Sequence, residues 1–143
     1  MEIWFHSKSS TYSWLSNFSE DGFTLDGEFW PSVEHFYQAQ KYVGTEHSMQ
    51  IRNAESPLKA RKAGKNRSLV PRPDWDEVKI VVMLSALEAK FLQNQRLKRK
   101  LLETKDHELV HESKSDSFWG RSREGAGQNY LGELLMQVRE ELA

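Results

Sequence analysis

The alternation of apolar and polar residues predicts short strands near the start of the chain. Residues 2–6 have the extended, mostly apolar pattern of one short strand. Residues 17–30 alternate weakly and contain two Asp-Gly dipeptides, Asp21-Gly22 and Asp26-Gly27. Asp-Gly is a common sequence in the tight turns that join antiparallel strands. The pattern therefore predicts a hairpin in this segment, with turns at both dipeptides.

A helix is predicted directly after this hairpin. Ser32 can accept the free amide protons of a first helical turn, which makes it a good N-cap. Phe36, Ala39 and Val43 then recur at the spacing of one helix face. We expect a helix over residues 33–43 that directs these three side chains into the core.

Further helices follow along the chain. The periodicity predicts helices at residues 46–52, 57–64, 74–93, 95–103 and 129–142, a strand at 108–112 and a loop at 116–128. The strongest signal begins at Asp74, because Glu77 three residues later completes a capping box. These elements predict an α+β fold that is mainly helical, with about six helices and a small antiparallel sheet. No repeat or linker interrupts them, so we expect one compact domain over residues 1–143.

The composition is that of an ordinary globular protein. Of the 143 residues, 38% are hydrophobic and 29% charged, and 20 Lys and Arg nearly balance 21 Asp and Glu. No overall field therefore draws the chain to nucleic acid or a membrane, and an anion site must be local. Cysteine is absent, which excludes disulfides, thiolate zinc sites and a cysteine nucleophile. With no signal peptide or membrane span evident, we expect a cytoplasmic monomer.

The five tryptophans are the least ordinary part of the composition. A buried indole N–H needs a hydrogen-bond partner, so tryptophan is a demanding choice for a small core. We expect Trp4 and Trp14 to be core residues. Trp30, Trp75 and Trp119 stand beside turn residues or charges, where lining a cleft competes with burial in the core.

Glu34 is the first candidate for chemistry. On a helix Glu34, Gln38 and Lys41 form one polar stripe opposite the apolar positions. From spacing alone such a stripe is most often exposed, and its acid then compensates the helix dipole by roughly 0.3–1 kcal/mol. Trp30 and His35, however, crowd the same helix start. A carboxylate flanked by aromatic rings suits glycosyl cleavage, where a positive oxocarbenium-like centre needs a negative charge or a water needs a base.

Asp116 is a second candidate carboxylate. It opens the segment Asp116-Ser117-Phe118-Trp119-Gly120, where an Asp frequently caps its own turn. A functional alternative has Asp116 hold a ribose hydroxyl or the reaction water while Phe118 or Trp119 stacks on a base. The sequence leaves both roles open.

A basic segment at residues 60–67 is the third candidate. Arg61 and Arg67 lie on either side of Gly64, and arginine binds phosphate with two parallel hydrogen bonds. Solvated surface charge is an equally good explanation of this segment. The basic run at residues 96–100 is more typical of an exposed helix face than of a nucleic-acid patch.

Metal and nucleotide-cofactor motifs are absent. His35 and His111 have no second ligand at a usable spacing. The sequence contains no glycine-rich dinucleotide fingerprint, no P-loop and no nucleophile elbow. We therefore expect neither a metal nor a cofactor.

The segment from Gly27 to Lys41 strongly resembles the signature of the YbiA-like (NADAR) family. Its core, Trp-Pro-Ser-x-Glu-His-x-x-Gln-Ala-Gln-Lys, is long enough to be specific. Further matches lie along nearly the whole chain: Ser16-Asn17-Phe18, Ala60-Arg61, Gly64, Arg67, Trp75, Lys90-Phe91, Asp116, Trp119-Gly120, Gly127-Gln128-Asn129 and Leu131-Gly132. The resemblance implies a compact, largely helical N-glycosidase domain. The implied substrates are phosphoribosylamino-pyrimidine intermediates of riboflavin synthesis or ADP-ribose attached to guanine, including guanine in nucleic acid.

The resemblance also implies a set of site residues. The family's catalytic glutamate falls on Glu34 and its aspartate on Asp116, while His111 stands where relatives often carry an acid. The implied substrate contacts are Phe18, Trp30, His35, Gln38, Lys41, Arg61, Arg67, Trp75 and Trp119. We expect a hydrolase that acts without metal or cofactor on a small phosphoribosyl or ADP-ribosyl substrate. The alternative is a non-catalytic ADP-ribose or nucleotide reader, which would keep the aromatic and basic residues but would not need Glu34.

Overall fold

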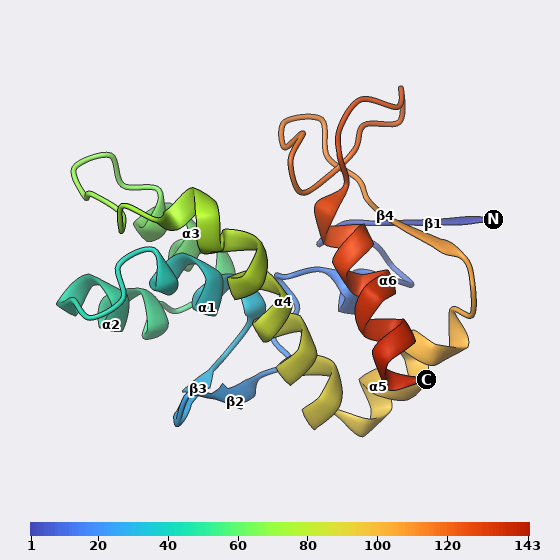
Figure 1. Ribbon diagram of the computed structural model, residues 1–143, viewed down its shortest axis with the longest axis horizontal. Helices are drawn as coiled ribbons and strands as arrows, with labels where there is room; N and C mark the ends of the chain where they lie inside the picture. Colours follow the sequence, from blue (N-terminus) through green and yellow to red (C-terminus); the bar gives the residue numbers. More distant parts are fainter. The chain divides into compact units, whose positions relative to one another are not determined.

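The computed structural model describes residues 1–143, which form two compact units. The first unit contains Met1–Ser16 and Phe91–Ala143, and the second contains Asn17–Lys90. The elements in chain order (Figure 1) are β1 (Glu2–Phe5), a 3₁₀ turn (Ser13–Leu15), β2 (Phe23–Leu25), β3 (Glu28–Trp30), α1 (Val33–Gln40), α2 (Glu46–Arg52), α3 (Pro57–Gly64), α4 (Trp75–Gln93), α5 (Gln95–Glu103), β4 (Glu108–His111) and α6 (Tyr130–Leu142). The expected fold class, mainly helical α+β with six helices and a small antiparallel sheet, is confirmed. None of the helices has both the length and the apolar composition that crossing a bilayer requires.

In the first unit, β1 and β4 form a parallel pair (Figure 1). Glu2 lies opposite Glu108 and Phe5 opposite His111. The sequence predicted both strands but only antiparallel pairing, so the expected sheet was incomplete. Alternation identifies a strand without identifying its partner or direction, and this partner lies about a hundred residues away.

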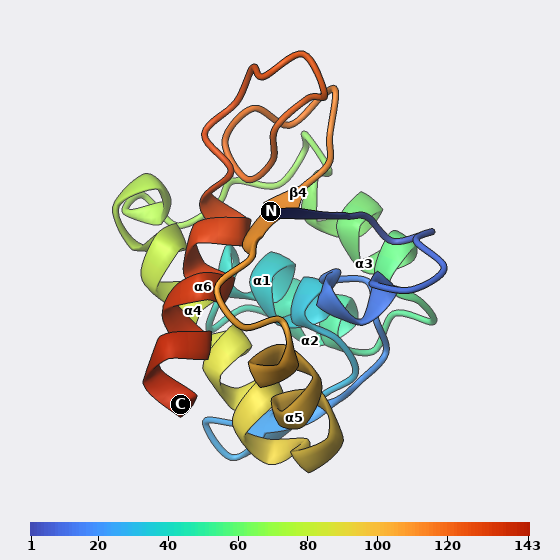
Figure 2. The same cartoon turned by 90° about the vertical axis from the view of Figure 1, so that its right-hand side faces the viewer.

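Asn129 joins β4 to the start of α6. Its backbone has φ 53°, a left-handed conformation that Asn tolerates. Its side chain accepts a hydrogen bond from His111 N and donates one to Leu109 O, both at 2.9 Å. A Cβ added at Gly132 would lie 2.0 Å from Leu109 O, so only glycine permits this close approach. Figure 2 shows the loop between β4 and α6, residues 112–129, returning from the strand to this junction.

In the second unit, the β2–β3 hairpin turns at Asp26 and Gly27. Their φ angles of 55° and 80° match a type I′ turn, the form that suits the twist of antiparallel strands. The second expected turn, at Asp21-Gly22, is wrong: these residues precede β2 and join no strands. A Cβ added at Gly22 would lie 2.3 Å from the Phe29 ring, so this glycine permits a close packing contact instead.

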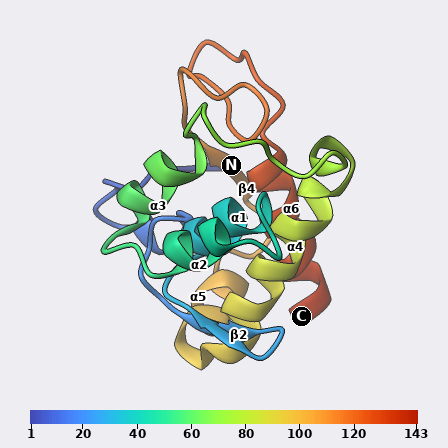
Figure 3. The ribbon, with the colours of Figure 1, turned by 90° about the vertical axis from the view of Figure 1, so that its left-hand side faces the viewer.

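Helices α1, α2 and α3 pack against one another (Figure 3). Ser32 caps α1 as expected, because its hydroxyl accepts the His35 amide at 3.2 Å. The helix ends at Gln40, three residues earlier than the periodicity predicts, and Gly44 at φ 84° belongs to the turn that follows. Val43 therefore lies in this turn and is 49% exposed, so its assignment to the core was wrong.

The start of α4 was located correctly, but the expected capping box does not describe it. The Asp74 carboxylate binds the Arg72 guanidinium, with Nε–Oδ1 at 2.6 Å and Nη2–Oδ2 at 3.0 Å. The Glu77 amide donates to the Asp74 backbone carbonyl instead of its side chain. Val81, an apolar residue of this helix, is exposed.

The tryptophans that are buried are not the ones expected in the core. Trp30 and Trp119 are buried, whereas Trp4 and Trp14 are only half-buried. Trp30 is buried because its ring meets Phe36 edge-on at 5.0 Å and its Nε1 donates to the Leu25 carbonyl. The buried side chains of the first unit include Phe5, Leu97, Leu101, Leu109, Val110, Leu131, Leu135 and Val138, and those of the second include Phe23, Val33, Phe36, Ala39, Ile51, Ala60, Met83 and Leu87.

Candidate active site

Glu34 lies in the first turn of α1 and is only 3% exposed. Its backbone amide donates to the Asn17 carbonyl at 3.2 Å, which joins the helix start to the segment before the hairpin. A carboxylate is costly to bury unless charged or polar groups hold it. The exposed polar stripe that spacing alone favours is therefore not what the fold contains.

Two side chains hold one oxygen of this carboxylate. Gln38 Nε2 donates to Glu34 Oε2 at 2.8 Å, and Arg61 Nε donates to the same atom at 3.2 Å. Glu34 Oε1 accepts no hydrogen bond from the protein. The carboxylate is thus fixed through one oxygen, and the other oxygen is left to a ligand or a water molecule.

Arg61 is itself held in place by an aromatic ring. Its guanidinium carbon lies 4.3 Å from the centroid of the Phe18 ring, within the range of a cation–π contact. The Arg61 side chain is 42% exposed, whereas the Glu34 side chain is 4% exposed. Arg61 therefore reaches from the surface to the buried acid, and part of its guanidinium stays accessible.

Gln38 is fixed from α3 by Gly64. A Cβ added at Gly64 would lie 2.2 Å from Gln38 Oε1, so the two helices approach with no room for a larger residue. The Gly64 carbonyl also accepts the Tyr42 hydroxyl at 2.7 Å. This contact holds the end of α3 against the turn that follows α1.

Two buried acceptors near Glu34 have no hydrogen-bond partner. They are Gln38 Oε1 and Asn17 Oδ1, and both residues are bonded to Glu34, one through its side chain and the other through its backbone. Buried polar atoms are nearly always paired in folded proteins. Gln38 Oε1 packs against Gly64, so this unmet acceptor lies in the contact between α1 and α3.

Lys41 follows the last residue of α1 and is half-buried. Burial lowers its pKa from the ordinary value to about 8, partly opposed by the nearby negative charge of Glu34. Its ammonium group lies 5.9 Å from the centroid of the Tyr37 ring. That ring meets Trp75 edge-on at 5.0 Å, so Lys41 and the expected wall residue Trp75 both contact Tyr37.

His35 has partners inside the protein on both ring nitrogens. Nδ1 lies 2.7 Å from Ser32 Oγ, and Nε2 lies 3.0 Å from the Ala54 carbonyl oxygen. A carbonyl only accepts, so Nε2 carries the proton and Nδ1 accepts from the hydroxyl. His35 and the buried Trp30 thus stabilise the start of α1, and neither offers an obvious contact for a ligand at Glu34.

Arg67 is the most exposed of the expected phosphate ligands. It lies in the turn after α3, and no hydrogen bond or ion pair joins it to the protein. The two arginines therefore differ: Arg61 binds the buried acid, and Arg67 makes no such contact.

Asp116 and Trp119 belong to the first unit. Asp116 Oδ1 accepts the backbone amides of Phe118 at 3.1 Å and Trp119 at 2.9 Å, so this Asp does cap its own turn. Asp116 is half-buried, and its Oδ2 has no partner in the protein. Trp119 is buried with its ring edge-on to Phe118 at 4.8 Å, and Phe118 stacks on Tyr130 at 4.7 Å.

Sequence reasoning missed two contributors to this site. Asn17 matched the family pattern, but no periodicity or charge marked it as a partner of the Glu34 backbone. Tyr37 was not among the expected site residues. Both depend on contacts between distant segments. No three His, Asp or Glu side chains come together in a metal-binding arrangement.

A family model described as the NADAR domain matches residues 4–143. The match covers nearly the whole chain, so the chain belongs to the NADAR family.

Named relatives define the class further. N-glycosidase YbiA from Escherichia coli (strain K12) is 42% identical over 139 residues, which cover 97% of this chain and 87% of that protein. The NMR structure of the E. coli protein YbiA matches with a TM-score of 0.89 at 41% identity, over 99% of this chain and 86% of that one. Riboflavin biosynthesis protein VVA0006 from Vibrio vulnificus is 39% identical over 140 residues, 98% of this chain but 38% of that protein. The N-glycosidase relatives place this chain among the hydrolases that act on N-glycosyl bonds.

Proposed function

We propose that this protein hydrolyses the N-glycosidic bond between a base or amino-pyrimidine and a phosphorylated ribose, with Glu34 as the catalytic carboxylate. One observation carries the proposal: Glu34 is buried, Gln38 and Arg61 hold its Oε2, and its Oε1 is left without a partner. A carboxylate that served only to stabilise the fold would be expected to use both oxygens when so deeply buried.

The reaction breaks the bond between ribose C1′ and the base nitrogen and forms a bond from C1′ to a water oxygen. The bonding electron pair leaves with the base nitrogen, which takes up a proton, and the water gives up a proton. The transition state carries positive charge at C1′. Glu34 Oε1 stabilises that charge or accepts the proton of the attacking water, and both roles need an ionised carboxylate held in place.

We assign the other expected site residues to roles according to where they lie. Phe18 and Trp75 form aromatic walls in the same unit as Glu34, with Tyr37 between Trp75 and Lys41. Arg67 and Lys41 bind the phosphate, because both carry cationic groups that no carboxylate neutralises by direct contact. Asp116 Oδ2 is proposed to hold a ribose hydroxyl or the reaction water, on the strength of the family resemblance.

The amino-pyrimidine form of the substrate is supported by a relative. A protein named for riboflavin biosynthesis contains a region that matches 98% of this chain. The same chemistry would release guanine from an ADP-ribosyl group, so the leaving base has to be identified by experiment.

The test is product analysis by mass spectrometry with three candidate substrates: a phosphoribosylamino-pyrimidine, ADP-ribosyl-guanine and a nicotinamide nucleotide. The wild type should release the base from one of them, and Glu34→Gln should slow turnover at least roughly 100-fold while keeping ligand binding. Glu46→Gln is the matched control, because Glu46 also lies in a first helical turn but is exposed. Binding without turnover by the wild type would indicate a reader, and normal turnover by Glu34→Gln would reject the role of Glu34.

A further inference from the structure

A pocket lies in the first unit, which does not contain Glu34. Its volume is about 300 Å³, at the lower end of the range of small-molecule sites. Eight residues line it: Ile3, Thr11, Tyr12, Trp14, Lys100, Glu103, Thr104 and His107. Neither the family resemblance nor the proposed reaction uses any of them.

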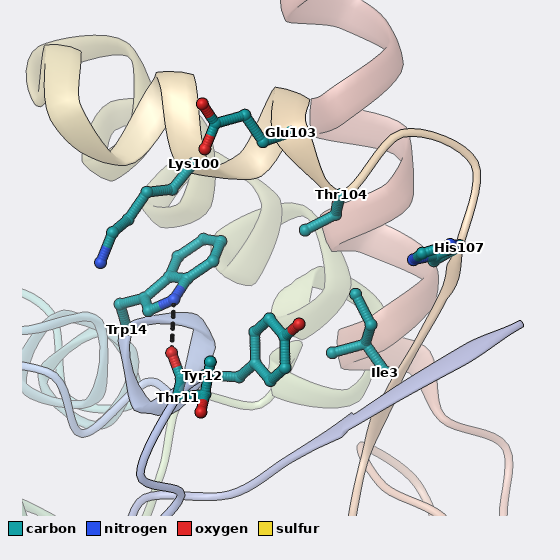
Figure 4. A pocket seen from close by; sticks show the side chains of 8 residues that line it. All are labelled: Ile3, Thr11, Tyr12, Trp14, Lys100, Glu103, Thr104 and His107. Carbon is teal, nitrogen blue, oxygen red and sulfur yellow. Dashed lines mark hydrogen bonds between the residues drawn. The ribbon is translucent and has the colours of Figure 1, made fainter.

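The lining of this pocket is divided by polarity (Figure 4). Lys100 and Glu103 come from α5 at one end, and Ile3, Tyr12 and His107 lie toward the other end. Trp14 stands beside Tyr12, with ring centroids 6.4 Å apart and planes inclined by 51°. Lys100 thus lies over the Trp14 ring at one end of the pocket, and the other end offers Tyr12, Ile3 and the His107 imidazole.

The two charged groups have no ion-pair partner. The Lys100 ammonium lies 5.4 Å from the centroid of the Trp14 ring and does not contact the Glu103 carboxylate. Lys100 and Glu103 are three residues apart on one helix, a spacing at which opposite charges can pair. Here they project separately at one end of the pocket, so each can bind a charge of the opposite sign.

Hydrogen bonds hold the wall behind the pocket. Thr104 is buried, and its hydroxyl donates to the Leu101 carbonyl and accepts from Arg139 Nη1. Arg139 also donates to the His107 carbonyl at 2.9 Å. The indole Nε1 of Trp14 is fixed by the Thr11 carbonyl at 3.0 Å. A pocket whose walls are held in this way is already formed before a ligand arrives, which favours binding.

We infer that this pocket binds a small zwitterion with a large apolar side chain, of the class of the free aromatic α-amino acids. Lys100 binds the carboxylate, Glu103 binds the ammonium group, and the ring lies against Tyr12 and Ile3. None of the lining residues is among the large hydrophobic side chains that the protein exposes. A small ligand therefore fits this pocket better than a protein interface, which needs a wider apolar surface.

Three probes of one shape test the inference by calorimetric titration: L-phenylalanine, phenethylamine, which lacks the carboxylate, and 3-phenylpropionate, which lacks the ammonium group. Lys100→Met should lower the affinity for L-phenylalanine and 3-phenylpropionate about tenfold and leave the affinity for phenethylamine unchanged. Glu103→Gln should lower the affinity for L-phenylalanine and phenethylamine to a similar extent and leave the affinity for 3-phenylpropionate unchanged.

Both variants change exposed or half-exposed positions, and thermal unfolding checks that they fold. They should also keep the wild-type rate of N-glycoside hydrolysis, because the proposed reaction does not involve them. The inference is overturned if L-phenylalanine shows no saturable binding at about 10 mM, a concentration that corresponds to roughly −3 kcal/mol. It is equally overturned if all three probes bind alike to wild type and variants, which would indicate a non-selective apolar surface for a partner protein.

Discussion

The side-chain amide of Gln38 packs directly on the backbone of Gly64. A Cβ added at position 64 would lie 2.2 Å from Gln38 Oε1 and 2.7 Å from Gln38 Cβ. Because Gln38 Nε2 in turn holds Glu34 Oε2, a glycine on α3 helps to determine where the proposed catalytic carboxylate lies. This contact connects the packing of two helices to the chemistry of the site.

Gly64→Ala should therefore impair the site more than the fold. Alanine favours a helix by up to about 1 kcal/mol over glycine, but forced overpacking destabilises by typically 1–3 kcal/mol. We expect the unfolding free energy to fall by about 1 kcal/mol and turnover to fall at least about tenfold, because Glu34 loses its position. Chemical denaturation and steady-state kinetics measure the two effects.

Gln38→Ala supplies the control. It removes the Oε1 and Cδ atoms that an alanine at position 64 would meet but keeps the Gln38 Cβ, which would still lie 2.7 Å away. The destabilisation by Gly64→Ala should therefore be smaller in the double variant without disappearing. Such non-additivity is the sign of a direct contact. Additive stability effects would show that the two residues do not act on each other.

Local signals predicted the helices well because helices depend on neighbouring residues. Ser32 caps α1 with its side chain as predicted, and Ser56 caps α3 in the same way. The parallel partner of β1 could not be predicted in this way, because the pairing depends on contact between residues far apart in sequence. The hairpin turn at Asp26-Gly27 was predictable for the same reason that the helices were: its backbone conformation is a property of those two residues.

The surroundings of Glu34 could be predicted only in part. The polar stripe of Glu34, Gln38 and Lys41 was visible in the sequence, but spacing alone favoured an exposed surface. Its burial results from the close approach of α3 at Gly64, which no periodicity in α1 indicates. Arg61 was expected to bind a ligand phosphate, but it donates a hydrogen bond to Glu34. This contact likewise depends on the packing of α1 against α3 and could not be predicted from the sequence of either helix.

Arg67→Ala tests the phosphate contact. A charge-assisted hydrogen bond contributes about 1.5–3 kcal/mol, so affinity for ribose 5-phosphate or ADP-ribose should fall roughly ten- to hundredfold. Affinity for the unphosphorylated sugar or nucleoside should hardly change. Calorimetric titration of both ligands at fixed salt gives the comparison.

Two outcomes would contradict this role of Arg67. Equal losses of affinity for both ligands would indicate a folding defect. No loss of affinity for either ligand would indicate that the phosphate is bound elsewhere, with Lys41 as the next candidate. Arg61→Ala is the informative neighbour, because removing Arg61 leaves the buried Glu34 without its cation. That variant should lose stability as well as activity, whereas Arg67→Ala should lose neither fold nor stability.

Lys41 should make phosphate binding depend on pH. Its pKa is lowered to about 8, so the amine is cationic below pH 8 and neutral above it. The part of phosphate affinity that Lys41 supplies should be present at pH 7 and lost as the pH rises through about 8. Titration of ribose 5-phosphate binding between pH 7 and 9.5 measures this midpoint. The ligand phosphate stays dianionic over that range because its second pKa is about 6.

Two variants identify Lys41 as the source of this pH dependence. Lys41→Arg stays charged across the range and should bind phosphate without the midpoint. Glu34→Gln removes the negative charge that raises the pKa of Lys41, so its midpoint should move below pH 8. An unchanged midpoint in both variants would assign the titration to another group.

Asp116 has two proposed tasks that a pair of substitutions can separate. Its Oδ1 accepts two backbone amides of the turn, from Phe118 and Trp119. Asp116→Asn keeps an Oδ1 acceptor but loses the charge, whereas Asp116→Ala loses both hydrogen bonds and should destabilise by about 1–2 kcal/mol. If Oδ2 holds the ribose or the reaction water, Asp116→Asn should unfold like the wild type and yet turn over roughly 100-fold more slowly. Full activity in Asp116→Asn, with lost stability in Asp116→Ala, would leave Asp116 as a cap of its own turn and Glu34 as the only carboxylate in the reaction.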